Sequence, residues 1–247
     1  MNFGLIGKSV SHSFSKTYFQ NKFLELNLKE YTYQNFDMLN LDNLKSIINE
    51  NNIVGLNVTK PFKESIIPLL DEIDETAKII GAVNCIKIIE KNNTKYLIGY
   101  NTDYYGFAQS IKPFLEPMHQ KALILGTGGA SKAIAYALKN IGVDYYFVTS
   151  GAKKTKNCFH YNELNTHVLN AFKLIVNCTP VGMFPNSEEC VAIPFEFLTN
   201  EHLLFDLIYN PEETLFLKKG KEKGAITING LNMLKLQADK AWQIWNT

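Results

Sequence analysis

Short apolar runs and longer amphipathic stretches alternate along nearly the whole chain. Short apolar runs bounded by polar or glycine residues predict buried strands, and apolar residues spaced three or four apart predict helices. The predicted strands are residues 2–6, 31–36, 53–58, 82–89, 96–100, 121–125, 144–149, 173–177, 203–206 and 225–228. The predicted helices are residues 15–27, 40–50, 61–70, 104–111, 128–141, 213–223 and 231–245. This alternation is typical of an α/β protein.

The order of these elements predicts two domains. In the first part, a polar turn at residues 91–94 joins two strands into a hairpin, and a hairpin among alternating elements implies a mixed sheet. A second strand–helix series starts at Lys121 and predicts a Rossmann-like parallel sheet. We place the boundary near residue 103 and expect a cleft between the two domains.

Composition narrows the function classes. The 247 residues are 46% hydrophobic, which supports folded cores and excludes a disordered chain. The formal net charge of +1 gives no reason to expect nucleic acid or a membrane surface as a partner. All 25 residues counted as Lys+Arg are lysine. Any phosphate or carboxylate must therefore be bound by lysines, hydroxyls or backbone N–H groups rather than by guanidinium forks.

The four cysteines have no CxxC spacing and form no Cys/His cluster, so no metal site is expected. We interpret them as reduced thiols of a cytoplasmic protein. The first residues lack the charged flank and long apolar core of a signal peptide. No apolar run reaches the roughly 20 residues of a membrane span.

Two polar runs follow predicted strands, where α/β proteins place their chemistry. Asn-Val-Thr-Lys-Pro-Phe-Lys ends at Lys63, and Asn-Thr-Asp ends at Asp103. Taken singly, Lys63 is typical of an exposed helix lysine and Asp103 of a helix N-cap. Taken together, and with Asn/Thr pairs beside both, they favour a pair that exchanges a proton with an alcohol.

A glycine-rich run, Gly-Thr-Gly-Gly-Ala-Ser at residues 126–131, lies between a predicted strand and a predicted helix. This context is typical of a dinucleotide site, where glycines permit close approach of a pyrophosphate to helix N-terminal N–H groups. Ser131 occupies the third glycine position of the usual pattern. The alternative is a glycine-rich turn that binds nothing. Next to a proton-exchanging pair, the loop suggests alcohol–carbonyl redox chemistry.

The strand at residues 144–149 ends in Ser150, and Lys153 and Lys154 follow. NAD sites usually carry an acidic residue here, which binds the ribose 2′-hydroxyl. Its absence and the two lysines favour the 2′-phosphate of NADP. The alternative is a solvated lysine-rich turn.

Near the N-terminus, Ser-His-Ser-Phe-Ser at residues 11–15 places several hydroxyls at the start of a helix. Hydroxyls and helix N-terminal N–H groups can bind a carboxylate, although ordinary capping explains the same residues.

These runs together resemble the shikimate dehydrogenase family nearly end to end. The resemblance also rests on Gly-Ala-Val-Asn at 81–84, Asn-Cys-Thr-Pro-Val-Gly at 177–182, Asp-Leu-Ile-Tyr-Asn-Pro at 206–211 and Asn-Gly-Leu-Asn-Met-Leu at 229–234, followed by Gln237. It implies reversible, NADP-linked reduction of 3-dehydroshikimate to shikimate, in the route to aromatic amino acids. It also implies a substrate domain of residues 1–103 and 231–247 and a nucleotide domain of residues 104–230.

The resemblance assigns roles to individual residues. Lys63 and Asp103 would be the catalytic pair. We prefer Lys63 as the main acid/base residue with Asp103 as its partner, and the sequence leaves the choice between the two open. Ser13 and Ser15 would hold the substrate carboxylate, and the ring and its hydroxyls would contact Thr59, Asn84, Tyr209 and Gln237. The cofactor would contact Gly126, Gly128, Gly129, Ala130, Ser131, Ser150, Lys153, Lys154, Thr179, Ile208, Gly230 and Met233.

One departure from the family pattern keeps other interpretations open. NADP-dependent members usually carry an arginine after the strand that ends here at Thr149, and this chain has Ser150 and Gly151 instead. An NAD-linked quinate/shikimate dehydrogenase is the nearest alternative, and a non-catalytic ligand sensor on the same fold is another. We expect a monomer or homodimer.

Overall fold

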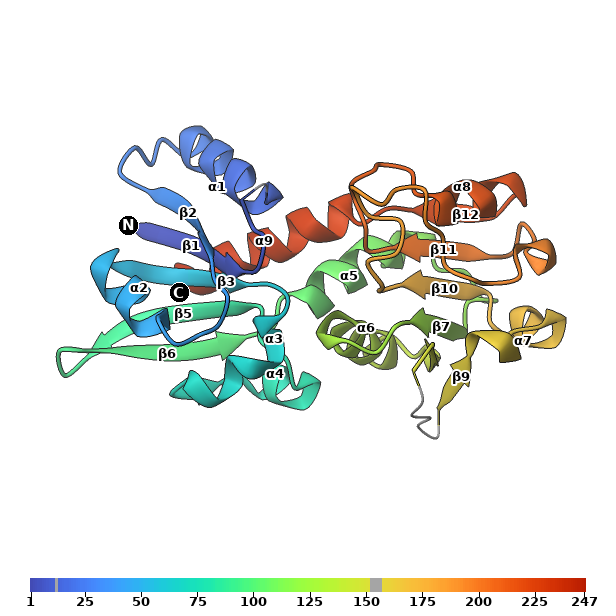
Figure 1. The fold of residues 1–247 in the computed structure, drawn as a ribbon, viewed down its shortest axis with the longest axis horizontal. Helices are drawn as coiled ribbons and strands as arrows, with labels where there is room; N and C mark the ends of the chain where they lie inside the picture. Colours follow the sequence, from blue (N-terminus) through green and yellow to red (C-terminus); the bar gives the residue numbers. More distant parts are fainter. Residues whose placement is uncertain (12, 152–156) are drawn as a thin grey trace. The chain divides into compact units, whose positions relative to one another are not determined.

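The computed structural model describes residues 1–11, 13–151 and 157–247, which form two compact units (Figure 1). The first unit consists of Met1–Thr102 and Gln237–Thr247, and the second of Asp103–Leu236. Each unit contains its own six-stranded sheet, which confirms the α/β class. The return from the second unit to the first falls inside helix α9 (Leu231–Trp245), six residues beyond the sequence-based boundary at residue 231.

The sheet of the first unit is mixed, as the hairpin predicted. Its strands, in spatial order, are β2 (Thr32–Asp37), β1 (Asn2–Gly7), β3 (Ile53–Val58), β5 (Cys85–Lys91), β6 (Thr94–Tyr100) and β4 (Glu72–Ile73). Strand β1 pairs in parallel with β2 and β3, whereas β5 pairs antiparallel with β3 and β6. The parallel strands therefore end at one edge, which carries the polar run after β3.

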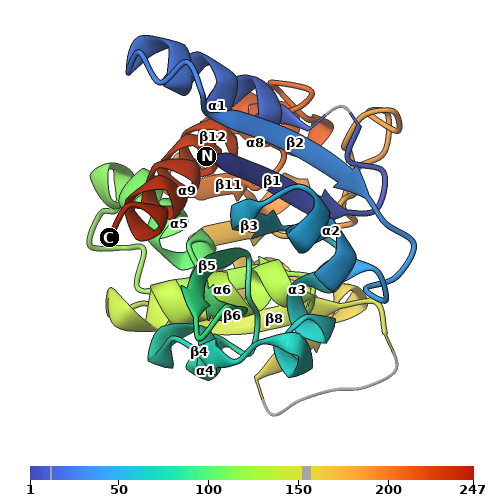
Figure 2. The same ribbon diagram turned by 90° about the vertical axis from the view of Figure 1, so that its left-hand side faces the viewer.

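Helices cover both faces of this sheet. They are α1 (Phe14–Glu25), α2 (Leu44–Glu50), α3 (Phe62–Ser65), α4 (Glu75–Ile80) and the end of α9. Because successive strand residues point to opposite faces, Phe3 and Leu5 of β1 pack in a core with α1 and α9, while Ile6 packs with α2 and α3. Figure 2 shows α9 beside β1, where Trp245 stacks on Phe3 at a ring-centroid distance of 4.8 Å.

All strand pairs of the second sheet are parallel. The spatial order is β12 (Ile226–Ile228), β11 (Leu203–Asp206), β10 (Leu174–Asn177), β7 (Lys121–Leu125), β8 (Asp144–Thr149) and β9 (Cys158–His160). The chain runs outward from β7 to β9 and then returns to β10 on the other side of β7. Open parallel sheets bind ligands outside the carboxyl ends of their strands at such a reversal point.

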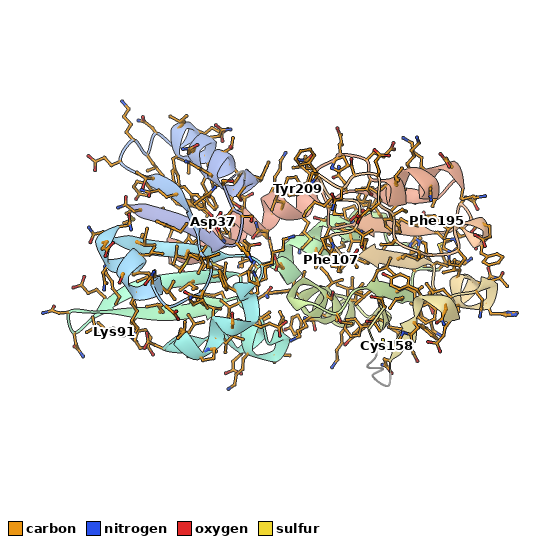
Figure 3. The ribbon with its side chains drawn as sticks, viewed as in Figure 1. Asp37, Lys91, Phe107, Cys158, Phe195 and Tyr209 are labelled. Carbon is orange, nitrogen blue, oxygen red and sulfur yellow. The ribbon has the colours of Figure 1, made fainter. Side chains whose placement is uncertain are left out.

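The second sheet is buried on both faces, and its central strands β7, β10 and β11 are accordingly apolar except at their ends. Its helices are α5 (Asp103–Ile111), α6 (Gly129–Asn140), α7 (Thr166–Ala171), α8 (Leu215–Glu222) and the start of α9. Ile124 of β7 packs with α5 and α6, and Leu125 packs with α7 and α8. Phe107 of α5 meets Phe205 of β11 edge-on, with ring centroids 5.0 Å apart (Figure 3).

The structure corrects several sequence-based boundaries. Strand β5 begins at Cys85 instead of residue 82, and the hairpin loop is only Asn92 and Asn93, both at positive φ. A two-residue loop with two positive φ angles suits the twist of paired strands, so the ladder extends closer to the turn than expected. Helix α4, capped by the side chain of Asp74, was not predicted, and neither were β4, β9 and α7.

Candidate active site

The glycine run forms the turn between β7 and α6, at the carboxyl edge of the second sheet. Gly126 has φ of +101°, a backbone conformation that residues other than glycine rarely adopt. Gly128 is the N-cap of α6, and no side chain caps this helix end or places an acid in its first turn. The first N–H groups of a helix lack intrahelical acceptors and attract anions. A Cβ at Gly128 would meet no atom within 4 Å, so the turn leaves room for a phosphate.

Ser131, at the third glycine position, faces the protein interior. It is 1% exposed, and its Oγ lies 3.6 Å from the point where a Cβ on Gly126 would sit. Its hydroxyl faces the thiol of Cys178, and burial raises the pKa of that thiol above its ordinary value. Because this side chain is buried, only the backbone of Ser131 is available to a ligand at the N-terminus of α6. Serine is small enough to keep the close packing that glycine usually provides here.

The turn after β8 was predicted to bind the ribose end of a cofactor. Ser150 is exposed there, and the next residue, Gly151, donates its N–H to the Thr149 hydroxyl at 3.0 Å. Lys153 and Lys154 lie outside the described residues. The position of Ser150 at the carboxyl end of a strand next to β7 suits the predicted role.

The other predicted cofactor residues follow β10, β11 and β12. Thr179 lies beside Gly126, whose Cβ would approach Thr179 Cγ2 to 3.1 Å. Gly230 donates its N–H to the Ile208 carbonyl at 3.0 Å, and a Cβ at this glycine would lie 2.1 Å from the Leu207 carbonyl oxygen. Only glycine therefore permits this close approach. Met233 is 7% exposed and packs in the core of the second unit.

Tyr209, a predicted substrate contact, lies in the loop after β11, directly after the buried Ile208 (Figure 3). Its ring is half-buried, and the loop that carries it is held by the hydrogen bond between the Ile208 N–H and Asp206 Oδ1, 3.0 Å long. The second unit thus places Tyr209 at the same carboxyl edge as the glycine turn.

In the first unit, three polar residues meet in a buried cluster. Asn84 Nδ2 donates to Thr102 Oγ1 at 3.0 Å and to Gln237 Oε1 at 3.3 Å, and Asn84 Oδ1 accepts the Thr102 N–H at 2.6 Å. The three residues are 3%, 0% and 8% exposed, respectively. Two predicted substrate contacts from distant parts of the chain, Asn84 and Gln237, are therefore brought together.

A second buried network connects the start of α1 with this cluster. Ser13 caps α1 by accepting the Ser15 N–H at 3.3 Å. The Ser15 hydroxyl bonds the hydroxyl of Tyr33, which donates to Asn57 Oδ1 at 2.8 Å. Asn57 Nδ2 in turn donates to the Asn84 carbonyl at 3.4 Å. Burial raises the pKa of Tyr33, so this phenol stays a neutral donor at ordinary pH.

The remaining predicted residues flank these networks. Thr59 follows β3 and donates its N–H to the Ile6 carbonyl at 3.0 Å. Lys63 is half-buried on the short helix α3, and its carbonyl accepts the Val83 N–H at 2.7 Å, which ties α3 to the segment before Asn84. Asp103 begins α5, is 6% exposed and directly follows the buried Thr102.

Sequence reasoning assigned no role to Tyr33, Asn57, Asn177 or Asp206. Asn177 and Asp206 are polar residues that end otherwise apolar strands, a signal that could have identified them. Within the described ranges, no group of three or more His, Cys, Asp or Glu residues could hold a metal ion. None of the helices described here is long and apolar enough to span a membrane.

A parallel sheet with a glycine turn at its reversal point is typical of a dinucleotide-binding unit. Together with the mixed-sheet unit, it places the chain in the class of two-unit α/β nucleotide-binding proteins. The comparisons with known proteins agree. Residues 5–86 match the family described as the shikimate dehydrogenase substrate binding domain. The shikimate dehydrogenase (NADP(+)) of Desulforamulus reducens is 36% identical, covering 98% of this chain and 88% of that protein.

Solved structures lead to the same family. A crystal structure of a shikimate dehydrogenase in complex with NADP+ matches with a TM-score of 0.84 and 35% identity, covering 99% of this chain and 89% of that chain. The enzyme from Thermus thermophilus, in complex with NADP(H) and shikimate, matches with a TM-score of 0.86 and 29% identity, covering 99% and 93%. This chain belongs to the shikimate dehydrogenase family.

Proposed function

We propose that this protein catalyses the reversible, NADP-dependent reduction of 3-dehydroshikimate to shikimate, in the cytoplasm and in the route to aromatic amino acids. The observation that carries the proposal is the match to proteins named shikimate dehydrogenase (NADP(+)) over 98% of the chain. The buried polar cluster of the first unit and the uncapped, phosphate-compatible glycine turn of the second support it.

The first unit is the substrate-binding unit in this proposal. The hydroxyls of Ser13 and Ser15 bind the substrate carboxylate. The ring and its hydroxyls contact Thr59, Asn84, Gln237 and Tyr209. The Asn84–Thr102–Gln237 cluster holds its side chains in place before the substrate arrives, which reduces the ordering cost of binding.

The second unit is the cofactor-binding unit. The N–H groups at the start of α6 would hold the pyrophosphate, and Ser150, Lys153 and Lys154 would hold the 2′-phosphate end. NADPH, when bound, supplies the hydride that reduces the C3 carbonyl carbon. Lys63 donates the proton that the developing alkoxide needs, and its positive charge stabilises that oxygen. Asp103 orients the substrate hydroxyls.

Isotope transfer tests this proposal. The purified protein would be incubated with 3-dehydroshikimate and NADPH that carries deuterium in place of both hydrogens at nicotinamide C4. The expected product is shikimate with one deuterium on C3, identified by mass spectrometry and NMR. Unlabelled shikimate, or no product while NADPH and substrate both bind, would contradict hydride transfer and support a ligand sensor.

A further inference from the structure

Two buried polar residues lie side by side at the carboxyl edge of the second sheet, next to the glycine turn. Asn177 ends β10 and Asp206 ends β11, and the two residues are paired in register. Asn177 is also paired with Leu125, the last residue of β7 before Gly126. Both polar side chains are 0% exposed. Their position places them directly beneath the loops that carry the predicted cofactor contacts.

Asp206 connects three segments through its two carboxylate oxygens. Oδ1 accepts hydrogen bonds from Asn177 Nδ2 at 3.1 Å and from the Ile208 N–H at 3.0 Å. Oδ2 accepts the Thr214 hydroxyl at 2.6 Å, and Thr214 caps helix α8. All three partners are donors, so one carboxylate can accept all three hydrogen bonds. An apolar side chain at this position would remove this acceptor from each of them.

Asn177 extends the connection toward the glycine turn. Its Oδ1 accepts both the N–H of Thr179, at 3.0 Å, and the Thr179 hydroxyl, at 2.7 Å. The methyl group of Thr179 in turn packs beside Gly126. A continuous row of contacts therefore runs from Gly126 through Thr179 and Asn177 to Asp206 and Ile208.

This row lies on one side of the glycine turn. In a sheet of this type the pyrophosphate lies over the end of β7, and the adenosine half extends toward β8. The ends of β10 and β11 lie on the opposite side of β7, so the loops fixed by Asn177 and Asp206 face the other half of a bound dinucleotide. The positions of the loops after β10 and β11 therefore affect the affinity for the nicotinamide half.

We propose that Asp206, acting through Asn177, is a positioning residue that fixes Thr179 and Ile208 for binding the nicotinamide half of the cofactor. This inference rests on the proposed function, because it requires that the second unit binds NADP. Asp206 itself touches no reacting atom. Burial raises the pKa of the Asp206 carboxyl, and the hydrogen bonds from its three donors oppose that rise. The three donors therefore offset part of the free-energy cost of burying the charged carboxylate.

Direct binding measurements test the proposal without relying on turnover. Isothermal titration calorimetry would give the dissociation constants of NADP+ and of 2′,5′-ADP, a fragment of NADP+ that lacks the nicotinamide half. For Asp206→Ala, and likewise for Asn177→Ala, we expect NADP+ to bind about tenfold more weakly, while 2′,5′-ADP binds as before. Asp206→Asn should stay within about threefold of the natural protein, because Thr214 can reverse its hydrogen bond to accept from the new amide.

The matched control is His202→Ala. His202 is also 0% exposed and precedes the other end of β11, where its ring bonds the Leu169 carbonyl and the turn at Thr199. This variant loses buried hydrogen bonds at the start of β11, the end of the strand that lies away from the cofactor edge. NADP+ binding should therefore not change. Equal weakening in His202→Ala and Asp206→Ala would show general loosening of the unit and overturn the proposal.

Two further outcomes separate the inference from the proposed function. If Asp206→Ala and Asn177→Ala bind NADP+ as tightly as the natural protein, the positioning role is overturned and the proposed function is unaffected. If the natural protein binds shikimate but neither NADP+ nor 2′,5′-ADP, the proposed function fails and the inference fails with it. Should Asp206→Ala not fold, Asn177→Ala gives the same decision.

Discussion

Asn84 Nδ2 lies 3.3 Å from Gln237 Oε1, although the two residues are 153 positions apart in the chain. Gln237 Oε1 also accepts the Thr102 hydroxyl at 3.2 Å. This one oxygen connects α9 to residues that follow α4 and β6. Gln237 therefore ties α9 to the rest of the first unit.

Replacing Gln237 should affect substrate binding more than turnover. Gln237→Ala removes the buried oxygen that accepts hydrogen bonds from both Asn84 and Thr102. We therefore expect the KM for shikimate to rise about tenfold and the KM for NADP+ to stay unchanged. Gln243→Ala is the matched control, since Gln243 is exposed on the same helix. Steady-state kinetics give the KM for shikimate of both variants. Equal values for Gln237→Ala and Gln243→Ala would show that the buried cluster does not support substrate binding.

Lys63 should be required for catalysis. Lys63→Ala removes the proposed proton donor, and general acid–base groups contribute about 10²–10⁴-fold, so kcat should fall by that order. Lys60→Ala is the control, because Lys60 is an exposed lysine three positions earlier. Rates with saturating shikimate and NADP+ check both variants. Near-normal kcat in Lys63→Ala would remove this residue from the mechanism.

The two glycines of the cofactor turn should respond differently to alanine. Gly126→Ala forces a side chain into φ of +101° and against Thr179, which should lower the free energy of unfolding by about 1–3 kcal/mol. Gly128→Ala meets no neighbouring atom and should leave stability unchanged. It should still weaken NADP+ binding, because the methyl group occupies space left for the phosphate. Urea unfolding and NADP+ titration measure the two effects, and unchanged binding by Gly128→Ala would place the phosphate elsewhere.

The buried carboxyl of Asp206 should make stability depend on pH. Burial raises its pKa from 3.8 to about 6. Between these two values the folded protein binds more protons than the unfolded chain, so the contribution of Asp206 to the free energy of unfolding falls as pH rises from about 4 to about 6. From the difference in pKa, the fall amounts to about 3 kcal/mol.

Asp206→Asn removes this titration. The difference in unfolding free energy, natural protein minus Asp206→Asn, should therefore decrease between about pH 4 and pH 6 and stay constant above about pH 7. Urea unfolding at several pH values gives this difference. A difference that is constant across the whole range would show that Asp206 does not titrate there.

The sequence predicted the fold because its strands and helices carry clear periodic patterns. The apolar strand at residues 121–125 and the glycine turn after it identified the nucleotide-type unit without further information. The elements that were missed are short. Strand β4 has two residues, β9 has three, and α4 and α7 have six each, too few to establish a periodicity.

The site was only partly predictable for a different reason. Motifs located Ser15, Asn84 and Gln237, but the residues that connect them are ordinary members of strands. Tyr33 has the pattern of a buried aromatic residue of β2, and nothing near it in sequence indicates its bond to Asn57, 24 positions away. Such connections depend on strand order in the sheet, which a local pattern does not contain.

The most direct test of the proposed function is a set of initial rates with shikimate or quinate, each combined with NADP+ or NAD+. We predict fast turnover for shikimate with NADP+ and much slower turnover for the other three combinations. Faster turnover with NAD+ or with quinate would contradict this prediction and assign the chain to the NAD-linked quinate/shikimate branch. No turnover in any combination, with shikimate bound, would contradict an enzymatic function.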